Sequence, residues 1–215
     1  LQGYGMTESA STLTLLGPED HVAGGPKLRS VGKPVPGIVV TIQDEDGNVL
    51  PAGKVGEVCA RGGNFMREYW NKPEATAEVF DGGWYHTGDA GYFDEDGYLF
   101  LSDRVKDMIV TGGENVYSTE VENAISSHEA VAEVAVIGIP DDVWGEAVHA
   151  IVVLHEELMA TAEELIEHAR ATIAGYKVPK SIDFRTEPLP LSGAMKVLKR
   201  ALREPYWEGR DSGIN

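Results

Sequence analysis

The sequence predicts an α+β fold in two parts: a small, twisted, β-barrel-like subdomain, then a compact α+β domain with a short mixed sheet and flanking helices. Two observations carry this prediction. Between residues 38 and 104, short runs of alternating apolar and polar residues are separated by turn clusters, which is typical of β-strands. After residue 106, helical and β-rich patterns alternate along the chain. We therefore expect domains over residues 1–105 and 106–215.

The first part is expected to contain mainly strands. Residues 1–30 are rich in Gly, Ser and Thr and are expected to be loop-like. A short helix is expected at residues 73–79. Strands are expected at residues 38–43, 55–61, 90–93 and 98–102, the last two flanking the turn at residues 94–97 as a hairpin.

The second part is expected to mix helices and strands. A capping box at residues 119–122 predicts a helix that runs to about residue 127. A further helix is expected at residues 161–174, where the apolar side chains share one face. The last helix is expected at residues 197–204, ending before Pro205. Strands are expected at residues 131–139, 147–154 and 181–184.

The charge of the chain limits the ligands that it can attract. Eighteen basic and 35 acidic residues give a formal net charge of −17. Nonspecific binding to nucleic acid is disfavoured, because it depends on Lys and Arg releasing counterions from phosphates. The same charge repels ATP or CoA at long range, so these anions would need a local cluster of donors and cations. No run of eighteen apolar residues occurs, so we expect no transmembrane segment.

Cys59 is the only cysteine in the sequence. No internal disulfide can form, which favours a reducing compartment, and we expect a cytoplasmic protein. Because Cys59 lies in a run that alternates with period two, we interpret it as a residue packed within a strand rather than a reactive thiol.

Three residues near the start of the chain have side chains suited to a nucleotide. Tyr4 offers a ring face on which a purine could stack, and Thr7 offers a hydroxyl group to a phosphate. Glu8 offers a hard oxygen ligand of the kind that Mg²⁺ prefers. On local sequence alone, a loop with a solvated glutamate is the favoured interpretation of this stretch.

Asp89 and Arg104 are candidates for binding a ribose. Asp89 presents two acceptor oxygens that suit the 2′ and 3′ hydroxyls, and Arg104 carries five donors in a rigid fork. The alternatives are a turn aspartate and a structural salt bridge. Further along, Gly112 and Gly113 allow positive φ and close backbone approach, although a tight turn explains them as well.

Taken together, these motifs resemble the signature of adenylate-forming enzymes, of the acyl-CoA synthetase (fatty-acid–CoA ligase) type. The resemblance implies that Lys106 is a hinge between two poses and that Gly112, Gly113 and Glu114 line the pantetheine tunnel during thioester formation. The plain alternative for Lys106 is a surface lysine. The resemblance also implies that six residues bind the nucleotide, with Glu8 holding the metal: Tyr4, Gly5, Thr7, Glu8, Asp89 and Arg104.

The same resemblance identifies Lys196 as the catalytic lysine. In the family, an invariant lysine in a similar context bridges the substrate carboxylate and the α-phosphate during adenylation. A lysine in a basic tail is otherwise simply solvated. The family usually has Gly directly before this lysine, whereas this chain has Met195, which bears on the conformation of the loop.

The resemblance implies an ATP-dependent, AMP-forming acid–thiol ligase. Such an enzyme converts a fatty or related carboxylic acid to acyl-AMP and then transfers the acyl group to CoA, with ATP, Mg²⁺ and CoA as cofactors. An adenylation domain that loads a carrier protein and a noncatalytic nucleotide-binding fragment are the alternatives, and a luciferase-type oxidation stays open.

A further expectation concerns the extent of the chain. The phosphate-binding loop of the family, rich in Ser, Thr and Gly, does not occur in this sequence. The chain therefore resembles a C-terminal fragment that needs the missing N-terminal portion of the same enzyme. We expect the isolated chain to be inactive in adenylation.

Overall fold

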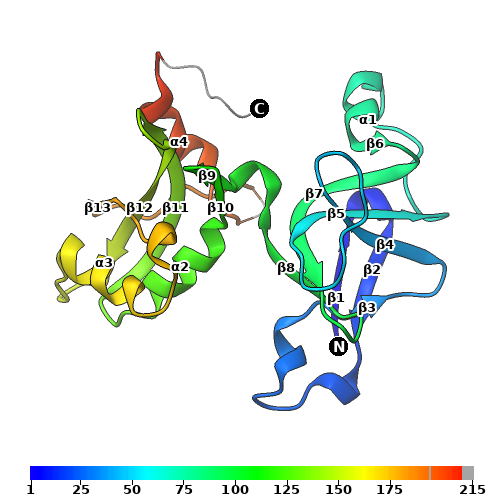
Figure 1. Cartoon of the computed structure of the whole chain (residues 1–215), viewed down its shortest axis with the longest axis horizontal. Coiled ribbons are helices and arrows are strands. Elements are labelled where there is room, and N and C mark those ends of the chain that lie inside the picture. Colours follow the sequence, from blue (N-terminus) through cyan, green and yellow to red (C-terminus); the bar gives the residue numbers. More distant parts are fainter. Residues whose placement is uncertain (194, 210–215) are drawn as a thin grey trace. The chain divides into compact units, whose positions relative to one another are not determined.

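The computed structural model describes residues 1–193 and 195–209, apart from the side chain of Ser11. The chain divides into two compact units, Leu1–Val105 and Lys106–Asn215, which are drawn in Figure 1 and described separately below. Within the described residues, no helix is long and apolar enough to span a membrane.

The N-terminal unit consists of two antiparallel sheets and one short α-helix, α1 (Pro73–Val79) (Figure 1). The smaller sheet has the order β1-β2-β3, formed by Gln2–Met6, Ser11–Leu16 and Lys33–Pro34. The larger sheet has the order β4-β5-β7-β6, with β8 paired to β7; its strands are β4 (Ile38–Gln43), β5 (Gly56–Gly62), β6 (Phe80–Asp81), β7 (Trp84–Phe93) and β8 (Leu99–Arg104). Short 3₁₀ turns occur at Thr7–Ser9, Pro18–Asp20 and Pro26–Arg29.

The expected β-rich subdomain is confirmed, and β4 and α1 have the predicted bounds. The expectation of a loop over residues 1–30 is wrong, because β1 and β2 form a hairpin there. Burial explains why this Gly- and Thr-rich segment is ordered. Leu13 and Leu16 are fully buried, and the buried Thr14 hydroxyl donates to the Val31 carbonyl oxygen at 2.6 Å.

Alternating side chains of the strands build the core of this unit. Val40 and Ile42 of β4 pack with Val58 and Ala60 of β5 and with Leu99 of β8. Cys59, which lies between Val58 and Ala60 on β5, is also fully buried. Burial raises the pKa of its thiol to about 12, with the Glu57 carboxylate adding to the effect. This burial confirms that Cys59 packs within a strand.

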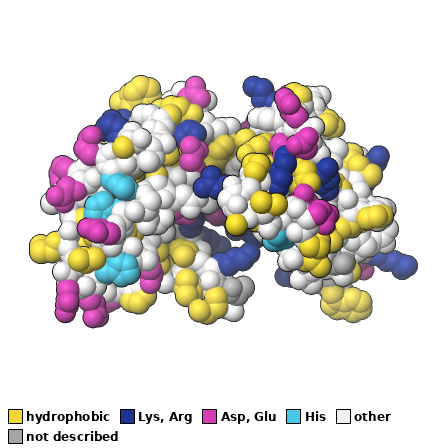
Figure 2. All heavy atoms as spheres, turned by 90° about the horizontal axis from the view of Figure 1, so that it is seen from below, with side chains coloured by type: hydrophobic (Ala, Val, Ile, Leu, Met, Phe, Trp, Pro, Cys, Tyr) yellow, Lys and Arg dark blue, Asp and Glu magenta, His cyan; other side chains and the backbone are white. Residues whose placement is uncertain are grey.

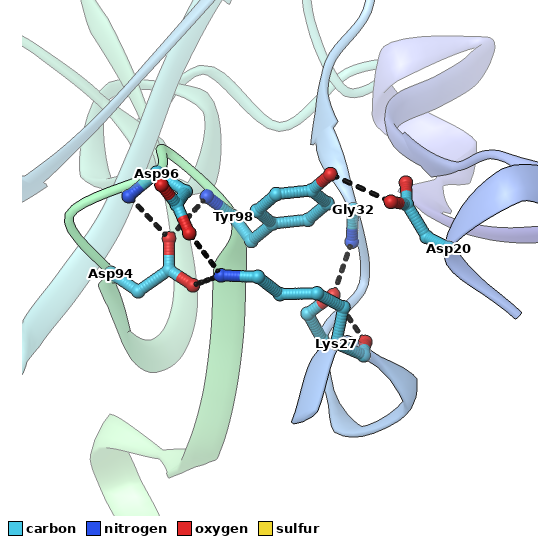
Figure 3. Close-up of polar contacts among 7 residues, drawn as sticks. Asp20, Lys27, Gly32, Asp94, Asp96 and Tyr98 are labelled. Atoms are coloured by element: carbon cyan, nitrogen blue, oxygen red, sulfur yellow. Dashed lines mark hydrogen bonds and ion pairs between the residues drawn. The ribbon is translucent and has the colours of Figure 1, made fainter. Parts of the chain in front are cut away.

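A polar cluster fixes the long connection before β3 onto the turn between β7 and β8 (Figure 3). The Lys27 ammonium lies 2.5 Å from an Asp94 oxygen and 2.7 Å from an Asp96 oxygen. The Tyr98 hydroxyl donates to Asp20 at 2.8 Å, and Lys27 lies 4.6 Å from the centre of the Tyr98 ring. The cluster therefore ties a segment without regular strands to a hairpin that the sequence predicts well.

The C-terminal unit contains one mixed sheet with helices on both faces. Its antiparallel path is β10-β9-β12-β11, and β13 pairs with β12 in parallel. The strands are β9 (Ile109–Thr111), β10 (Glu114–Val116), β11 (Val131–Asp141), β12 (Gly145–Leu154) and β13 (Ser181–Arg185). The helices are α2 (Ser118–Ser126), α3 (Ala162–Arg170) and α4 (Lys199–Trp207), with 3₁₀ turns at Val105–Asp107 and Gly175–Lys177.

The alternation of β11 divides this core into two layers. Val136 packs with α2 and α3 on one face, whereas its neighbours Ala135 and Ile137 pack with Leu202 of α4 on the other. Successive side chains of a strand point to opposite faces, so both layers follow from one apolar run. The expected α+β unit with a mixed sheet is confirmed.

Predicted boundaries are wrong at all three helices of this unit. Helix α3 ends at Arg170, four residues before the predicted end, and helix α4 begins at Lys199, two residues after the predicted start. Helix α2 begins at Ser118 with Tyr117 as its N-cap, so Thr119 lies inside the first turn instead of capping it. Helix α4 continues through Pro205 to Trp207. Two side chains beyond the proline hold this last turn: the Tyr206 hydroxyl donates to Asp183 at 2.6 Å, and the Trp207 ring nitrogen donates to the Gly138 carbonyl at 3.0 Å. These tertiary contacts override the local tendency of proline to end the helix.

Candidate functional site

A bulge in β7 presents the Asp89 side chain. Glu57 of β5 pairs with Ala90 and Cys59 pairs with His86, so Val58 alone faces the three β7 residues 87–89. Within the bulge, Gly88 has a φ of +71°, which favours glycine. The Glu57 carboxylate accepts the Gly88 N–H at 3.0 Å. Because a bulge redirects the side chains of its strand, this geometry accounts for the orientation of Asp89.

Tyr4, Asp89 and Arg104 form one polar network. Asp89 and Arg104 face each other across β7 and β8, and the Arg104 Nε lies 3.3 Å from Asp89 Oδ1. The Tyr4 hydroxyl donates to Asp89 Oδ2 at 2.6 Å. Burial, and then the Asp89 charge, raise the pKa of Tyr4 far above its usual value, so the phenol stays protonated as a donor. The structure thus joins three predicted residues that lie up to 100 positions apart.

Glu8 lies in the 3₁₀ turn after β1 and is half-buried. The Tyr69 hydroxyl donates to its Oε1 at 2.8 Å, and the Tyr69 and Tyr85 hydroxyl oxygens are 3.5 Å apart. Burial raises the pKa of Tyr85, followed by its hydrogen bond to Tyr69 and the charges of Glu8 and Asp89. Glu8 is thus linked through Tyr69 to Tyr85.

Gly5 and Thr7 lie on either side of the end of β1. Gly5 is exposed and follows a register shift between Tyr4 and itself in the pairing of β1 with β2. Thr7 is also exposed, at the start of the 3₁₀ turn. Gly5 directly follows Tyr4 in the sequence, and Thr7 directly precedes Glu8. The exposed Thr7 faces solvent.

The glycine pair of the C-terminal unit forms a tight turn. Thr111 and Glu114 pair across β9 and β10, so Gly112 and Gly113 are the two turn residues, with φ values of +61° and +83°. A Cβ atom on Gly112 would lie 2.7 Å from the Trp144 ring, so this position requires glycine. The tight-turn interpretation is therefore observed directly. Glu114 is exposed at the start of β10.

Lys196 lies on a closed loop before α4. Leu191 and Val197 pair across the base of the loop, and the Ser192 N–H donates to the Lys196 carbonyl at 2.7 Å. The Lys196 side chain is exposed. Met195 has a φ of +59°, the left-handed region that glycine adopts without strain. The chain therefore keeps at Met195 the backbone shape that suits the glycine typical of the family.

The predicted residues fall into two groups. The N-terminal unit brings Tyr4, Asp89 and Arg104 together and holds Glu8 through its hydrogen bond with Tyr69. In the C-terminal unit, residues 112–114 and Lys196 lie on separate elements, and Lys106 is exposed in the 3₁₀ turn where that unit begins. On the face drawn in Figure 2, acidic side chains are interspersed with smaller groups of basic ones, which agrees with the acidic composition.

Sequence reasoning missed Tyr69 and Glu57. Tyr69 lies in the connection between β5 and α1, where its N–H donates to the Thr76 hydroxyl at 2.9 Å. Glu57 orients the bulge through Gly88. No local pattern marks either residue, because Tyr69 acts on a partner 61 positions away and Glu57 on a partner 31 positions away.

Comparison with known families and proteins identifies the family of the chain. The profile of the family described as "AMP-binding enzyme" matches residues 1–70, and that described as "AMP-binding enzyme C-terminal domain" matches residues 120–196. A fatty acid–[acyl-carrier-protein] ligase, ScoC, from Streptomyces coeruleorubidus is 44% identical over 214 residues, which cover all of this chain and 41% of the relative. The chain belongs to the adenylate-forming enzyme superfamily.

Further relatives within this superfamily extend the comparison. A long-chain-fatty-acid–CoA ligase from Yersinia pestis is 46% identical over 95% of this chain and 35% of its own length. The structure of o-succinylbenzoate CoA synthetase from Bacillus subtilis, in complex with ATP and magnesium ion, has a TM-score of 0.83 and 39% identity, covering 94% of this chain and 40% of that one. The chain thus spans about two fifths of the length of the relatives that it matches.

Proposed function

We propose that this chain supplies the ribose-binding residues and the C-terminal unit of an AMP-forming acid–thiol ligase. In the first half-reaction, a carboxylate oxygen attacks the α-phosphorus of ATP, a new P–O bond forms, and pyrophosphate leaves. In the second, the thiol of CoA attacks the acyl carbon, the bond to the AMP oxygen breaks, and the thiol proton is lost to solvent. Fatty or related carboxylic acids are the proposed substrates.

The network of Tyr4, Asp89 and Arg104 is the observation that carries this proposal. A carboxylate offers about four lone-pair sites. Tyr4 and Arg104 use one site on each Asp89 oxygen, so each oxygen can still accept a hydrogen bond from a ribose hydroxyl. Because Arg104 is about half exposed, its remaining guanidinium donors can reach the ribose or a phosphate.

Glu8 and Thr7 are the proposed residues for Mg²⁺ and phosphate. Tyr69 fixes one Glu8 oxygen at 2.8 Å and so orients the other as a hard ligand, which fits the preference of Mg²⁺ for carboxylate oxygen. The exposed Thr7 hydroxyl suits a phosphate oxygen. When bound, the ion would neutralise charge on the phosphates. The relative solved with ATP and magnesium ion supports this assignment.

Lys196 is the proposed adenylation residue, and Lys106 the hinge. A lysine on an exposed loop can bind the carboxylate and α-phosphate oxygens as negative charge develops between them. Rotation at Lys106 would then withdraw Lys196 and bring the turn of Gly112, Gly113 and Glu114 to the thioester step. The exposed position of Lys106 at the start of the C-terminal unit supports the hinge.

The relatives support a longer working enzyme, because each extends well beyond the matched part. We propose that an N-terminal portion supplies the phosphate loop and the acyl pocket, and that the isolated chain forms no acyl-adenylate. The single, buried cysteine agrees with a reducing, cytoplasmic location.

A chimeric enzyme tests this function. Residues 1–215 would replace the matching 41% of the Streptomyces coeruleorubidus ligase, and each half-reaction would be measured separately. We expect the chimera to form acyl-adenylate. The Lys196→Ala variant should lower that rate by about 10²–10³ yet spare thioester formation from supplied acyl-adenylate. Equal loss of both half-reactions would contradict the two-pose mechanism, and pyrophosphate release by the isolated chain would contradict its dependence on an N-terminal portion.

Loading of a carrier protein is a second candidate, because the ScoC relative, which matches the whole chain, is named a ligase for acyl carrier protein. Mass spectrometry of the chimera's products, with CoA and with a carrier protein offered together, separates the two acceptors. A noncatalytic nucleotide-binding role predicts AMP binding to the isolated chain but no turnover by any chimera.

A further inference from the structure

We propose that Glu57, Cys59 and His86 form a binding site for one Zn²⁺ ion, or a similar borderline-soft divalent metal, in the N-terminal unit. Their carboxylate oxygen, sulfur and imidazole nitrogen all lie within 4.8 Å of one another. This inference does not depend on the proposed ligase activity.

The distances between the donor atoms suit tetrahedral zinc. Bond lengths of about 2.3 Å to sulfur and 2.0 Å to nitrogen separate the two ligand atoms by about 3.5 Å. The Cys59 Sγ and the His86 Nδ1 are 3.5 Å apart. The His86 Nδ1 and Glu57 Oε2 are 2.8 Å apart as a hydrogen-bonded pair, so the carboxylate would move outward by about half an ångström to coordinate the metal.

The sheet holds these three donors in place before any metal arrives. Cys59 and His86 face each other across β5 and β7, and Glu57 lies two residues before Cys59 on the same strand. The Gly88 N–H binds the second Glu57 oxygen, Oε1, at 3.0 Å. This bond leaves Oε2 pointing toward His86, and such an outer hydrogen bond typically orients a metal ligand.

Charge and exposure also favour a divalent ion. A thiolate and a carboxylate together balance a double positive charge, and the neutral imidazole adds none. Cys59 is fully buried, whereas Glu57 and His86 are each 25% exposed, so the site has an apolar floor and a solvent-facing side. Three protein ligands with one open position for water is an arrangement that zinc adopts in proteins. Binding would break the S–H bond of Cys59 and release its proton to the buffer.

Titration of the 215-residue chain with Co²⁺, followed by displacement with Zn²⁺, tests the site. Cys59 is the only cysteine, so any absorption from thiolate-to-cobalt charge transfer must come from this residue. We expect this band to saturate at one ion per chain and to disappear on addition of Zn²⁺. Cys59→Ser should abolish the band, and Glu57→Gln should weaken Co²⁺ binding by more than about tenfold.

A matched control addresses other histidines. His128 and His168 lie with their ring centres 5.0 Å apart and are the alternative pair for a surface metal. His168→Asn should leave the cobalt band unchanged. Circular dichroism verifies that Cys59→Ser and Glu57→Gln fold, and Glu57→Gln keeps the thiol as a second variant if Cys59→Ser does not. Absence of the band, or its loss in His168→Asn, would overturn the proposal.

Discussion

Replacing Met195 with glycine should stabilise the C-terminal unit, although it removes a large side chain. Met195 has a φ of +59° and is 76% exposed, so its side chain contributes little packing to offset the backbone strain. A non-glycine residue in the left-handed region costs about 1–2 kcal/mol. Glycine removes this cost but adds about 0.5–1 kcal/mol of backbone entropy to the unfolded state. The difference predicts a net gain of about 0.5–1 kcal/mol.

Urea and thermal unfolding of the full chain measure this gain, with Met159→Gly as the control. Met159 is 93% exposed and its backbone lies outside the left-handed region. The same substitution there carries only the entropic cost, so it should destabilise by about 0.5–1 kcal/mol. If Met195→Gly lowers the free energy of unfolding as much as Met159→Gly does, strain at Met195 is not stored in the loop and the reasoning fails.

Three further predictions concern the network, the polar cluster and a buried histidine. Asp89→Asn should weaken AMP binding to the chain by about 10–100-fold in calorimetry, because the hydrogen bonds to a charged acceptor are lost. The control Asp81→Asn, at the exposed end of β6, should leave AMP binding unchanged. Lys27→Met should lower the urea midpoint of the N-terminal unit, and unchanged unfolding would show that the ion pairs of Figure 3 are fully offset by solvation. Burial lowers the pKa of His149 below its usual value of 6.5, and the Asp183 charge opposes this shift. The neutral imidazole therefore contributes its full share to the free energy of unfolding above pH 6.5, and this contribution is lost as the pH falls. His149→Gln should flatten this pH dependence in unfolding experiments between about pH 7 and pH 5.

Local patterns were sufficient where an element is stabilised by its own residues. Strand β4 and helix α1 have the predicted bounds because alternation and turn residues delimit them. Helix α3 begins with a reciprocal capping box between Thr161 and Glu164, so the residues that stabilise its start all lie within four consecutive positions. The order of the longer elements was predictable for the same reason, whereas the strands β1, β2, β3, β6, β9 and β10 were not predicted.

Long-range contacts decided the features that the sequence did not predict. The hairpin of β1 and β2 depends on burial of Leu13 and Leu16, and the passage of α4 through Pro205 depends on contacts made by the two residues after it. The bulge of β7 depends on the register with β5, so the orientation of Asp89 could not be derived from its neighbours. The residues of the candidate site were identifiable from a family motif, whereas their geometry was not.

An acidic chain can still bind a polyanion if some of its basic side chains are paired with carboxylates within the fold and others remain exposed to a ligand. Several basic side chains are partly buried and already paired with carboxylates: Lys27 with Asp94, Lys177 with Glu120, Lys199 with Glu122 and Arg203 with Glu146. Arg104 differs because its pairing with Asp89 leaves it 47% exposed, and within the part of the chain that the structure describes Lys196 forms no ion pair. Since the overall field repels phosphate, a ligand gains most from charges that have not been neutralised. Of these six cations, Arg104 and Lys196 are the most exposed, so their removal should affect nucleotide binding more and folding less than removal of the other four.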